Sequence, residues 1–215
     1  MNLRPAFRNF YFLLFLFWLL AGGFLLLSYE KKELHLLING AATDSADLFF
    51  YYFTDVGDGL FAAILIVILL VFSRKKAIQA GLSVIASALI AQFLKRVVFS
   101  DSPRPYKYFG NGKGLHLADG LSMHSENSFP SGHATSAFAL FFCLAMMTSN
   151  RLIQSFFFVI AVTAGFSRVY LSQHFLGDVF MGSVIGVATS LLIYFWLEKK
   201  INPKFDSPFG FLQKK

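Results

Sequence analysis

Long runs of apolar residues, several of them free of charge, restrict most strongly how this chain can fold. A helix that crosses a membrane needs about 20 mostly apolar residues. Six segments approach this length, alone or with a short extension, and they predict an all-α, polytopic membrane protein with six transmembrane helices. These segments are Phe10–Leu27, Asp58–Phe72 extended by Phe49–Phe53, Ala77–Leu94, Ala134–Thr148 starting near Ser131, Leu152–Ser167 and Phe175–Leu197.

The composition agrees with a membrane protein and excludes two other classes. Hydrophobic residues make up 56% of the chain and charged residues 14%, against about 45–50% and about 25% in soluble domains. A disordered chain would lack this apolar content. The single cysteine, Cys143, excludes an intramolecular disulfide and a cysteine-cluster metal site.

The first apolar run resembles a signal peptide in that Arg4 and Arg8 precede it. It is longer than the usual apolar core of a signal peptide, and no pair of small residues marks a cleavage site before Tyr29. We therefore expect an uncleaved first span. No repeat or low-complexity segment stands out, so we expect one membrane domain over residues 1–215, in which Asp44–Phe53 lies along the membrane interface.

Basic residues are distributed unequally between the two sides that six spans would create. The side with both termini carries eleven basic and two acidic residues, a net charge of +9, whereas the other side carries eight basic and ten acidic residues, a net charge of −2. Because basic loops tend to stay in the cytoplasm, we expect both termini there. The residues counted on this side are Arg4, Arg8, Arg74, Lys75, Lys76, Arg151, Lys199, Lys200, Lys204, Lys214, Lys215, Glu198 and Asp206.

This distribution also explains the formal net charge of +7 as a consequence of topology. We expect no nucleic-acid partner, because no soluble segment interleaves basic and aromatic residues. The loops Ser28–Val56 and Lys95–Pro130 and the turn Leu171–His174 would face outward.

Three polar segments fall on this outward side, next to the predicted spans. They are Lys95–Pro105, Pro130–His133 and the stretch from Ser167 to Asp178. The spans follow from the apolar residues alone, so the common location of these polar segments indicates that they form one site.

The segment Pro130-Ser131-Gly132-His133 opens the fourth predicted span. Ser131 is a natural helix N-cap, and the free N–H groups at a helix start attract anions. Gly132 would let an anion approach the backbone closely. A plain capped helix start is the alternative explanation for this segment.

His174 and Asp178 are four residues apart, so on a helix they would share a face. A carboxylate that binds one imidazole nitrogen fixes the tautomer and makes the other nitrogen a better nucleophile or base. The alternative is a His–Asp pair that only caps the sixth span. An ionisable residue at the edge of an apolar span favours function.

Lys95, Arg104 and Arg168 are cations near the same membrane face. The planar fork of an arginine suits phosphate oxygens, and lysine acts as a point charge. The alternative is that basic side chains extend to lipid headgroups, which we prefer for Arg96, Lys107 and Lys113. With two histidines, one of which can attack phosphorus while the other protonates the leaving oxygen, these groups predict phosphoryl transfer.

The three segments resemble the signature of the type-2 phosphatidic acid phosphatase family, which includes vanadium haloperoxidases. That signature is Lys-x6-Arg-Pro, then Pro-Ser-Gly-His, then Ser-Arg-x5-His-x3-Asp. The second and third motifs match at every fixed position, whereas Lys95 and Arg104 enclose eight residues instead of six. Arg96 is therefore an alternative to Lys95 for the first cation.

The resemblance implies a helical catalytic core of the acid phosphatase/haloperoxidase type over residues 55–196. It implies a nucleophile at His174, an orienting carboxylate at Asp178 and a general acid at His133. Phosphate would be bound by Lys95, Arg104, Ser131, Gly132 and Arg168. It implies no metal and no cofactor. His35, His116 and His124 lie outside the motifs, and we expect them to be exposed loop histidines, with His124 nearest the substrate entrance.

The function expected from this resemblance is a lipid phosphatase of the cytoplasmic membrane, with its site on the outer face. Its substrate would be a lipid phosphate or pyrophosphate such as phosphatidate, phosphatidylglycerol phosphate, undecaprenyl pyrophosphate or a lipid A phosphate. A lipid phosphotransferase using the same phosphohistidine intermediate is an alternative. A non-enzymatic transporter or scaffold is disfavoured because His174, His133 and Asp178 are all present. The sequence leaves the oligomeric state open.

Overall fold

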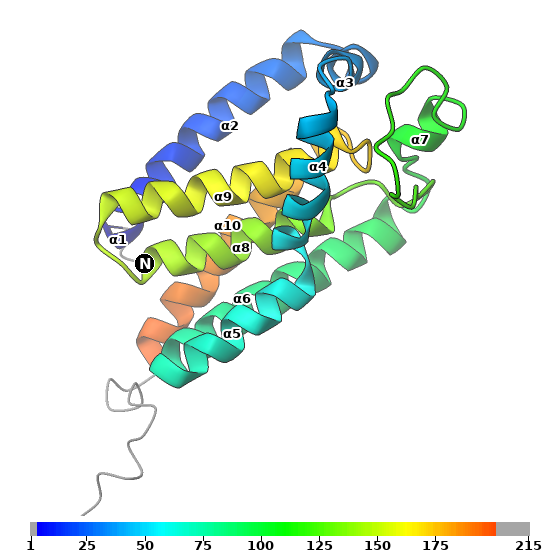
Figure 1. Ribbon diagram of the computed structural model, residues 1–215. Coiled ribbons are helices and arrows are strands. Elements are labelled where there is room, and N and C mark those ends of the chain that lie inside the picture. The colour runs from blue at the N-terminus through cyan, green and yellow to red at the C-terminus, as the bar shows by residue number, and fades with distance from the viewer. Residues whose placement is uncertain (1–3, 201–215) are drawn as a thin grey trace, which may run out of the picture.

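The computed structural model describes residues 4–200, and the secondary structure of this part is helical (Figure 1). Four helices are long and apolar enough to cross a membrane, and a bent pair supplies a fifth span if it is counted as one. The structure thus confirms an all-helical membrane protein with four to five candidate spans. The four are α2 (Phe10–Ser28), α6 (Arg74–Phe93) with its π-helical continuation η2 (Leu94–Val98), α9 (Arg151–Tyr170) and α10 (Leu176–Lys200).

The bent pair consists of α4 (Asp44–Phe53) and α5 (Gly59–Phe72), joined by the 3-10 helix η1 (Thr54–Gly57). The pair is bent by 55°, so the aromatic stretch predicted to extend α5 does not continue it in a straight line. Each helix has its own N-cap: Thr43 accepts from the Ala46 N–H, and Asp58 accepts from the Leu60 N–H. The chain therefore starts a new helix at Asp58.

The remaining helices are shorter. Of these, α8 (Gly132–Met146) is apolar and has 15 residues, while α1 (Arg4–Phe7), α3 (Lys31–Asn39) and α7 (Pro105–Tyr108) lie at the ends of the bundle. The charges at Lys204, Asp206, Lys214 and Lys215, counted above, lie outside the described residues.

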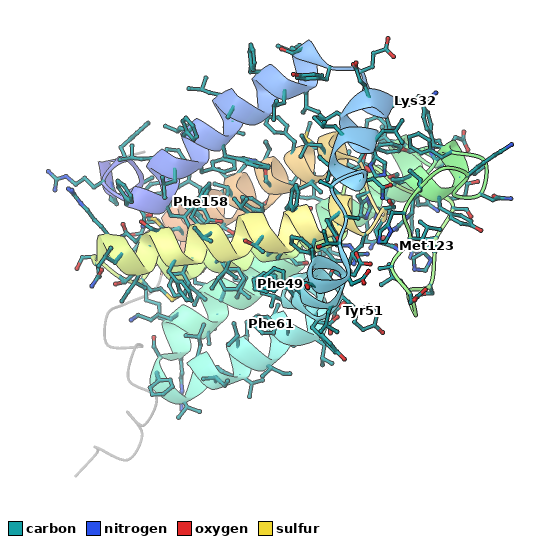
Figure 2. The ribbon with its side chains drawn as sticks, turned by 45° about the horizontal axis from the view of Figure 1, so that its top comes forward. Lys32, Phe49, Tyr51, Phe61, Met123 and Phe158 are labelled. Carbon is teal, nitrogen blue, oxygen red and sulfur yellow. The ribbon has the colours of Figure 1, made fainter. Side chains whose placement is uncertain are left out.

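The core is built around α8, which contacts α6, α9 and α10. Its side chains from Ala137 to Cys143 are buried almost completely. The aromatic core extends to α2, where Tyr11 packs edge-on against Phe142 and Phe158. Figure 2 shows Phe158 on α9 directed towards α2. Because α8 is buried in this core, the polar segment at its start has a fixed position.

A close approach of α10 to α8 depends on Gly186. A Cβ atom at this position would lie 2.5 Å from the Thr135 carbonyl oxygen and 2.8 Å from the Ala139 nitrogen. Small residues permit such backbone contact between membrane helices. The contact holds the middle of α10 against the first half of α8.

Figure 1 shows how the connections are divided between the two ends of the bundle. The segments α3 and α7 and the turn between α9 and α10 lie at one end, whereas α1 and the α5–α6 and α8–α9 connections lie at the other. The three polar segments of the sequence therefore share one end of the molecule. They do so because successive long helices run in opposite directions through the bundle.

Candidate active site

His174 lies in the turn between α9 and α10 and is buried, with 1% of its surface exposed. Its Nδ1 atom is 3.3 Å from Oδ2 of Asp178, in the first turn of α10. Burial lowers the pKa of His174 to about 3, although the hydrogen bond and charge of Asp178 act in the opposite direction. The ring is therefore neutral at neutral pH, with Nδ1 held by Asp178 and Nε2 left for chemistry.

Asp178 is itself held by several donors. Its Oδ2 atom accepts from the Phe175 N–H at 2.9 Å and from the Ser128 hydroxyl. Its backbone carbonyl accepts from the Ser131 N–H at 3.0 Å. These bonds link the start of α10 to the segment before α8 and fix the carboxylate that orients His174.

The start of α8 has the geometry expected of a capped helix that leaves room for an anion. Ser131 is buried and its Oγ accepts from the Ala134 N–H at 3.4 Å. Next to it, a Cβ atom built on Gly132 would meet no other atom within 4 Å. The space beside the first N–H groups of α8 is thus open.

His133 is the second residue of α8, and its side chain is 30% exposed. Its Nε2 atom lies 3.8 Å from Oδ2 of Asp58. The charges of Arg168, Lys95 and Arg104 also act on its ring. His133 therefore faces the same cations as His174, but it is more accessible.

The first motif places Lys95, and not Arg96, at the site. Lys95 is buried within the π-helical turn η2, whereas Arg96 is exposed. The charge of Lys95 interacts with those of Arg104, Asp178 and Arg168. The wider π-helical turn directs Lys95 inward despite the longer spacing between Lys95 and Arg104.

Arg104 precedes α7 and connects two loops at the site. Its Nε donates to the Glu126 carbonyl oxygen at 2.9 Å, and its Nη1 donates to the Gln173 carbonyl oxygen at 3.2 Å. Burial lowers its pKa, and the charge of Asp178 opposes this. The contact with Gln173 places its guanidinium beside the residue that precedes His174.

Arg168, in the last turn of α9, is buried and donates from Nη1 to Oγ1 of Thr54 at 2.7 Å. Its Nε has no partner within the described part of the chain. A buried guanidinium with a free N–H group is suited to bind an anion such as phosphate. Thr54 comes from η1, the segment at which the α4–α5 pair bends.

The three histidines outside the motifs have different surroundings. The prediction that His35 is an exposed loop residue was wrong: it lies on α3, is 2% exposed and has its Nε2 3.2 Å from Oγ of Ser172. It is buried because α3 packs against the end of α9. His116 is exposed in a loop, as predicted, and pairs with Asp47 at 2.7 Å.

His124 is exposed and lies near the candidate site. Burial and the charges of Arg104, Arg168 and Lys95 lower its pKa. The loop that carries it lies at the same end of the bundle, where Figure 2 labels its neighbour Met123. His124 is therefore an exposed loop histidine, as predicted, and it lies close enough to the three cations for their charges to act on it.

Three residues that contact the site were not singled out from the sequence. Thr54 accepts a hydrogen bond from Arg168, and Ser128 donates one to Asp178. Asp58 lies within 3.8 Å of His133. Only Asp58 carried a signal, as an ionisable residue at the edge of an apolar run, and it was interpreted as the start of a span. Within residues 4–200, no group of three or more His, Cys, Asp or Glu side chains could hold a metal ion.

The fold and the site together define a helical membrane protein with a buried His–Asp pair, a second histidine and three cations at one end of the bundle. A model of the PAP2 superfamily matches residues 76–202. Because this match covers more than half of the chain, the protein belongs to the PAP2 superfamily.

Curated relatives support this assignment. The chain is 30% identical to undecaprenyl-diphosphatase BcrC of Bacillus subtilis (strain 168) over 135 residues, which is 62% of this chain and 64% of BcrC. It is 32% identical over 111 residues to a lipid A 1-phosphatase of Rhizobium johnstonii, covering 51% of this chain and 43% of the relative. The chain thus spans less than two thirds of the length of either relative.

A solved structure supports the fold over nearly the whole chain. It is a transmembrane PAP2-type phosphatidylglycerolphosphate phosphatase from Bacillus subtilis, with a TM-score of 0.68 and 22% identity. The similarity covers 94% of this chain and 100% of that structure. The membrane fold of this superfamily therefore extends beyond the segment matched by the family model.

Proposed function

We propose that the protein is an integral membrane lipid phosphatase that removes a terminal phosphate through a phosphohistidine intermediate. The observation that carries this proposal is the buried His174–Asp178 pair, which leaves Nε2 of a neutral imidazole free beside Lys95, Arg104 and Arg168. Cations of this kind stabilise the charge that develops on a transferring phosphoryl group.

In the first step, the lone pair on Nε2 of His174 attacks phosphorus while the bond from phosphorus to the lipid oxygen breaks. His133 gives its proton to that oxygen, so the lipid leaves as an alcohol or, from a diphosphate, as a monophosphate. Asp178 stabilises the positive charge on the His174 ring.

In the second step, water attacks the phosphohistidine and breaks the phosphorus–nitrogen bond. His133 accepts the proton from this water molecule and regains the form in which the cycle began. Inorganic phosphate is released, and His174 returns to its neutral state.

The substrate class is a lipid with a terminal phosphate or diphosphate, because the site lies at one end of a bundle of apolar helices. The names of the relatives include an undecaprenyl diphosphatase and a lipid A phosphatase, and phosphatidate and phosphatidylglycerol phosphate belong to the same chemical class. A tail that remains in the bilayer would present its phosphate at the level of the α9–α10 turn.

We further propose that the chain is one membrane domain, with a catalytic core over residues 55–196, and crosses the membrane six times. The bent α4–α5 pair would form the second span and α8 the fourth. The basic excess at the end opposite the site supports a cytoplasmic location for both termini and an outward-facing site.

The test is phosphate release from a panel of lipid monophosphates, polyprenyl pyrophosphates and lipid A by the full-length protein in detergent, with a chelator present. We expect release from at least one lipid, and complete loss of release in His174→Ala. Labelled substrate should leave acid-labile phosphate on the wild-type protein. Wild-type release by His174→Ala would overturn the assignment of the nucleophile.

A further inference from the structure

The short helix η1 contacts the site at two points, one at Arg168 and one at His133. At one end of η1, Thr54 accepts a hydrogen bond from Arg168. Near its other end, a Cβ atom on Gly57 would lie 3.1 Å from both Cβ and the carbonyl oxygen of His133. The residue that follows, Asp58, is therefore held against the start of α8.

The two carboxylate oxygens of Asp58 have separate surroundings. Oδ1 accepts from the Leu60 N–H at 2.7 Å and caps α5, and Oδ2 lies 3.8 Å from Nε2 of His133. The cap fixes the orientation of the carboxylate. The second oxygen is thereby held towards the imidazole at the distance of an ion pair.

The charges around His133 show why this carboxylate matters. Burial of the ring and the charges of Arg168, Lys95 and Arg104 all oppose a positive charge on His133, whereas Asp58 favours it. A general acid must carry its proton when the substrate arrives. Asp58 is the carboxylate that the described part of the chain pairs with His133.

Building on the proposed phosphatase function, we propose that Asp58 is a positioning residue that holds His133 and stabilises its protonated form. The pair Asp58–His133 then parallels the pair Asp178–His174, with the opposite purpose. Asp178 orients a neutral nucleophile, and Asp58 favours the protonated form of a proton donor against burial and the neighbouring cations. At 3.8 Å, beyond hydrogen-bond length, the proton on Nε2 stays available for the leaving oxygen.

The test uses two substrates that differ in their need for a proton donor. An alkyl lipid monophosphate leaves as a strongly basic alkoxide, whereas 4-nitrophenyl phosphate leaves as a stable phenolate that requires little protonation. Asp58→Asn removes the charge and keeps an oxygen that can cap α5. We expect Asp58→Asn to reduce kcat on the lipid by about tenfold or more and kcat on the aryl ester by less than about threefold.

The matched control is Asp55→Asn, which removes an exposed charge of the same segment that acts on Arg168, a residue both substrates require. This variant should change the ratio of the two rates by less than about twofold, and Asp58→Glu should restore part of the ratio. Because both rates are measured on one sample, any loss of folded protein cancels in the ratio. The alkaline limb of the pH profile on the lipid should also move to lower pH in Asp58→Asn.

Equal slowing of both substrates, or no slowing of either, in Asp58→Asn would overturn the role of Asp58 while leaving the phosphatase function intact. Absence of lipid phosphate release by the wild-type protein would overturn the function itself. The two failures are therefore distinguishable.

Discussion

The two histidines of the candidate site occupy regions that are built differently. At the α9–α10 turn, His174 is buried, and its partner Asp178 accepts hydrogen bonds from Phe175 and Ser128. At the junction of η1 and α8, His133 is 30% exposed and faces Asp58 across 3.8 Å. We call the first, around His174 and Asp178, the tightly bonded region. The second, around His133 and Asp58, is the open region.

This difference fits the roles that we propose. A nucleophile must hold one nitrogen on the phosphorus atom, and fixed geometry lowers the barrier to attack. A proton donor must serve a leaving oxygen and then a water molecule, which occupy different positions. The contrast predicts that variants around His174 lower kcat for every substrate. Variants around His133 should lower kcat by an amount that depends on the basicity of the leaving group.

The largest effect is expected from Asp178→Asn. The amide retains the volume of the carboxylate, but it cannot stabilise the positive ring that forms on His174, so kcat should fall by about a hundredfold or more. The fall should be similar for a lipid monophosphate and for 4-nitrophenyl phosphate, as measured by phosphate or nitrophenolate release. The exposed Asp101 supplies the control, since Asp101→Asn should retain wild-type rates.

His133→Ala should give a loss that, unlike that of Asp178→Asn, depends on the leaving group. Removal of a general acid costs about 100-fold or more when the leaving group is a strong base. We therefore expect this loss for the lipid monophosphate and a much smaller one for 4-nitrophenyl phosphate, measured as kcat for each. An equal loss on both would show that His133 serves structure or binding instead, and the contrast between the two regions would fail.

The tightly bonded region was also easier to predict from the sequence. The long apolar runs gave helices close to those observed, such as Leu152–Ser167 within α9 (Arg151–Tyr170), because membrane helices are set by length and hydropathy. The sequence placed the polar motifs on one side, and the structure gathers them at one end of the bundle. The spacing of His174 and Asp178 predicted their contact, which the structure contains at 3.3 Å.

The open region was harder to predict, because its contacts join segments that are far apart in the chain. Thr54 meets Arg168 across 114 positions, and no local pattern encodes such a pair. The bend between α4 and α5 falls at Asp58, which caps a new helix, whereas the apolar residues on either side suggest a straight extension. Asp58 was visible as a charge at the edge of a span, but its partner was not.

Thr54→Val tests the link between the open region and the cations. Valine removes the acceptor of a buried bond from Arg168 and keeps a similar shape, which costs about 1 kcal/mol or more at a charged donor. Because the released guanidinium would bind phosphate less well, KM for the lipid should rise by about fivefold, with a smaller change in kcat. The buried Thr189, about three turns beyond Asp178 on α10, offers a comparison, since Thr189→Val should leave KM within about twofold. A fall in kcat with unchanged KM would contradict a positioning role for Thr54.

The smallest effect concerns the stability of the tightly bonded region and follows from His35. Its Nε2 is 3.2 Å from Oγ of Ser172 in the turn before His174, and its buried Nδ1 has no partner among residues 4–200. Burial lowers its pKa to about 4 from 6.5. Between pH 4 and pH 6.5, the His35 ring therefore binds more protons in the unfolded chain than in the folded protein. The stability that depends on a neutral His35 is fully present above about pH 6.5 and is lost as the pH falls towards 4.

His35→Gln removes this titration and keeps an amide that can reach Ser172. Between about pH 7.5 and about pH 4.5, the variant should lose about 2–3 kcal/mol less stability than the wild-type protein, as measured by denaturation midpoints in detergent. At the higher pH the imidazole is neutral, so the difference in stability between the two proteins there measures only the loss of packing. His174 titrates with the same sign, so part of the acid sensitivity should remain. An identical pH dependence in both proteins would mean that α3 does not stabilise the His174 turn, and the region would be less rigid than its hydrogen bonds imply.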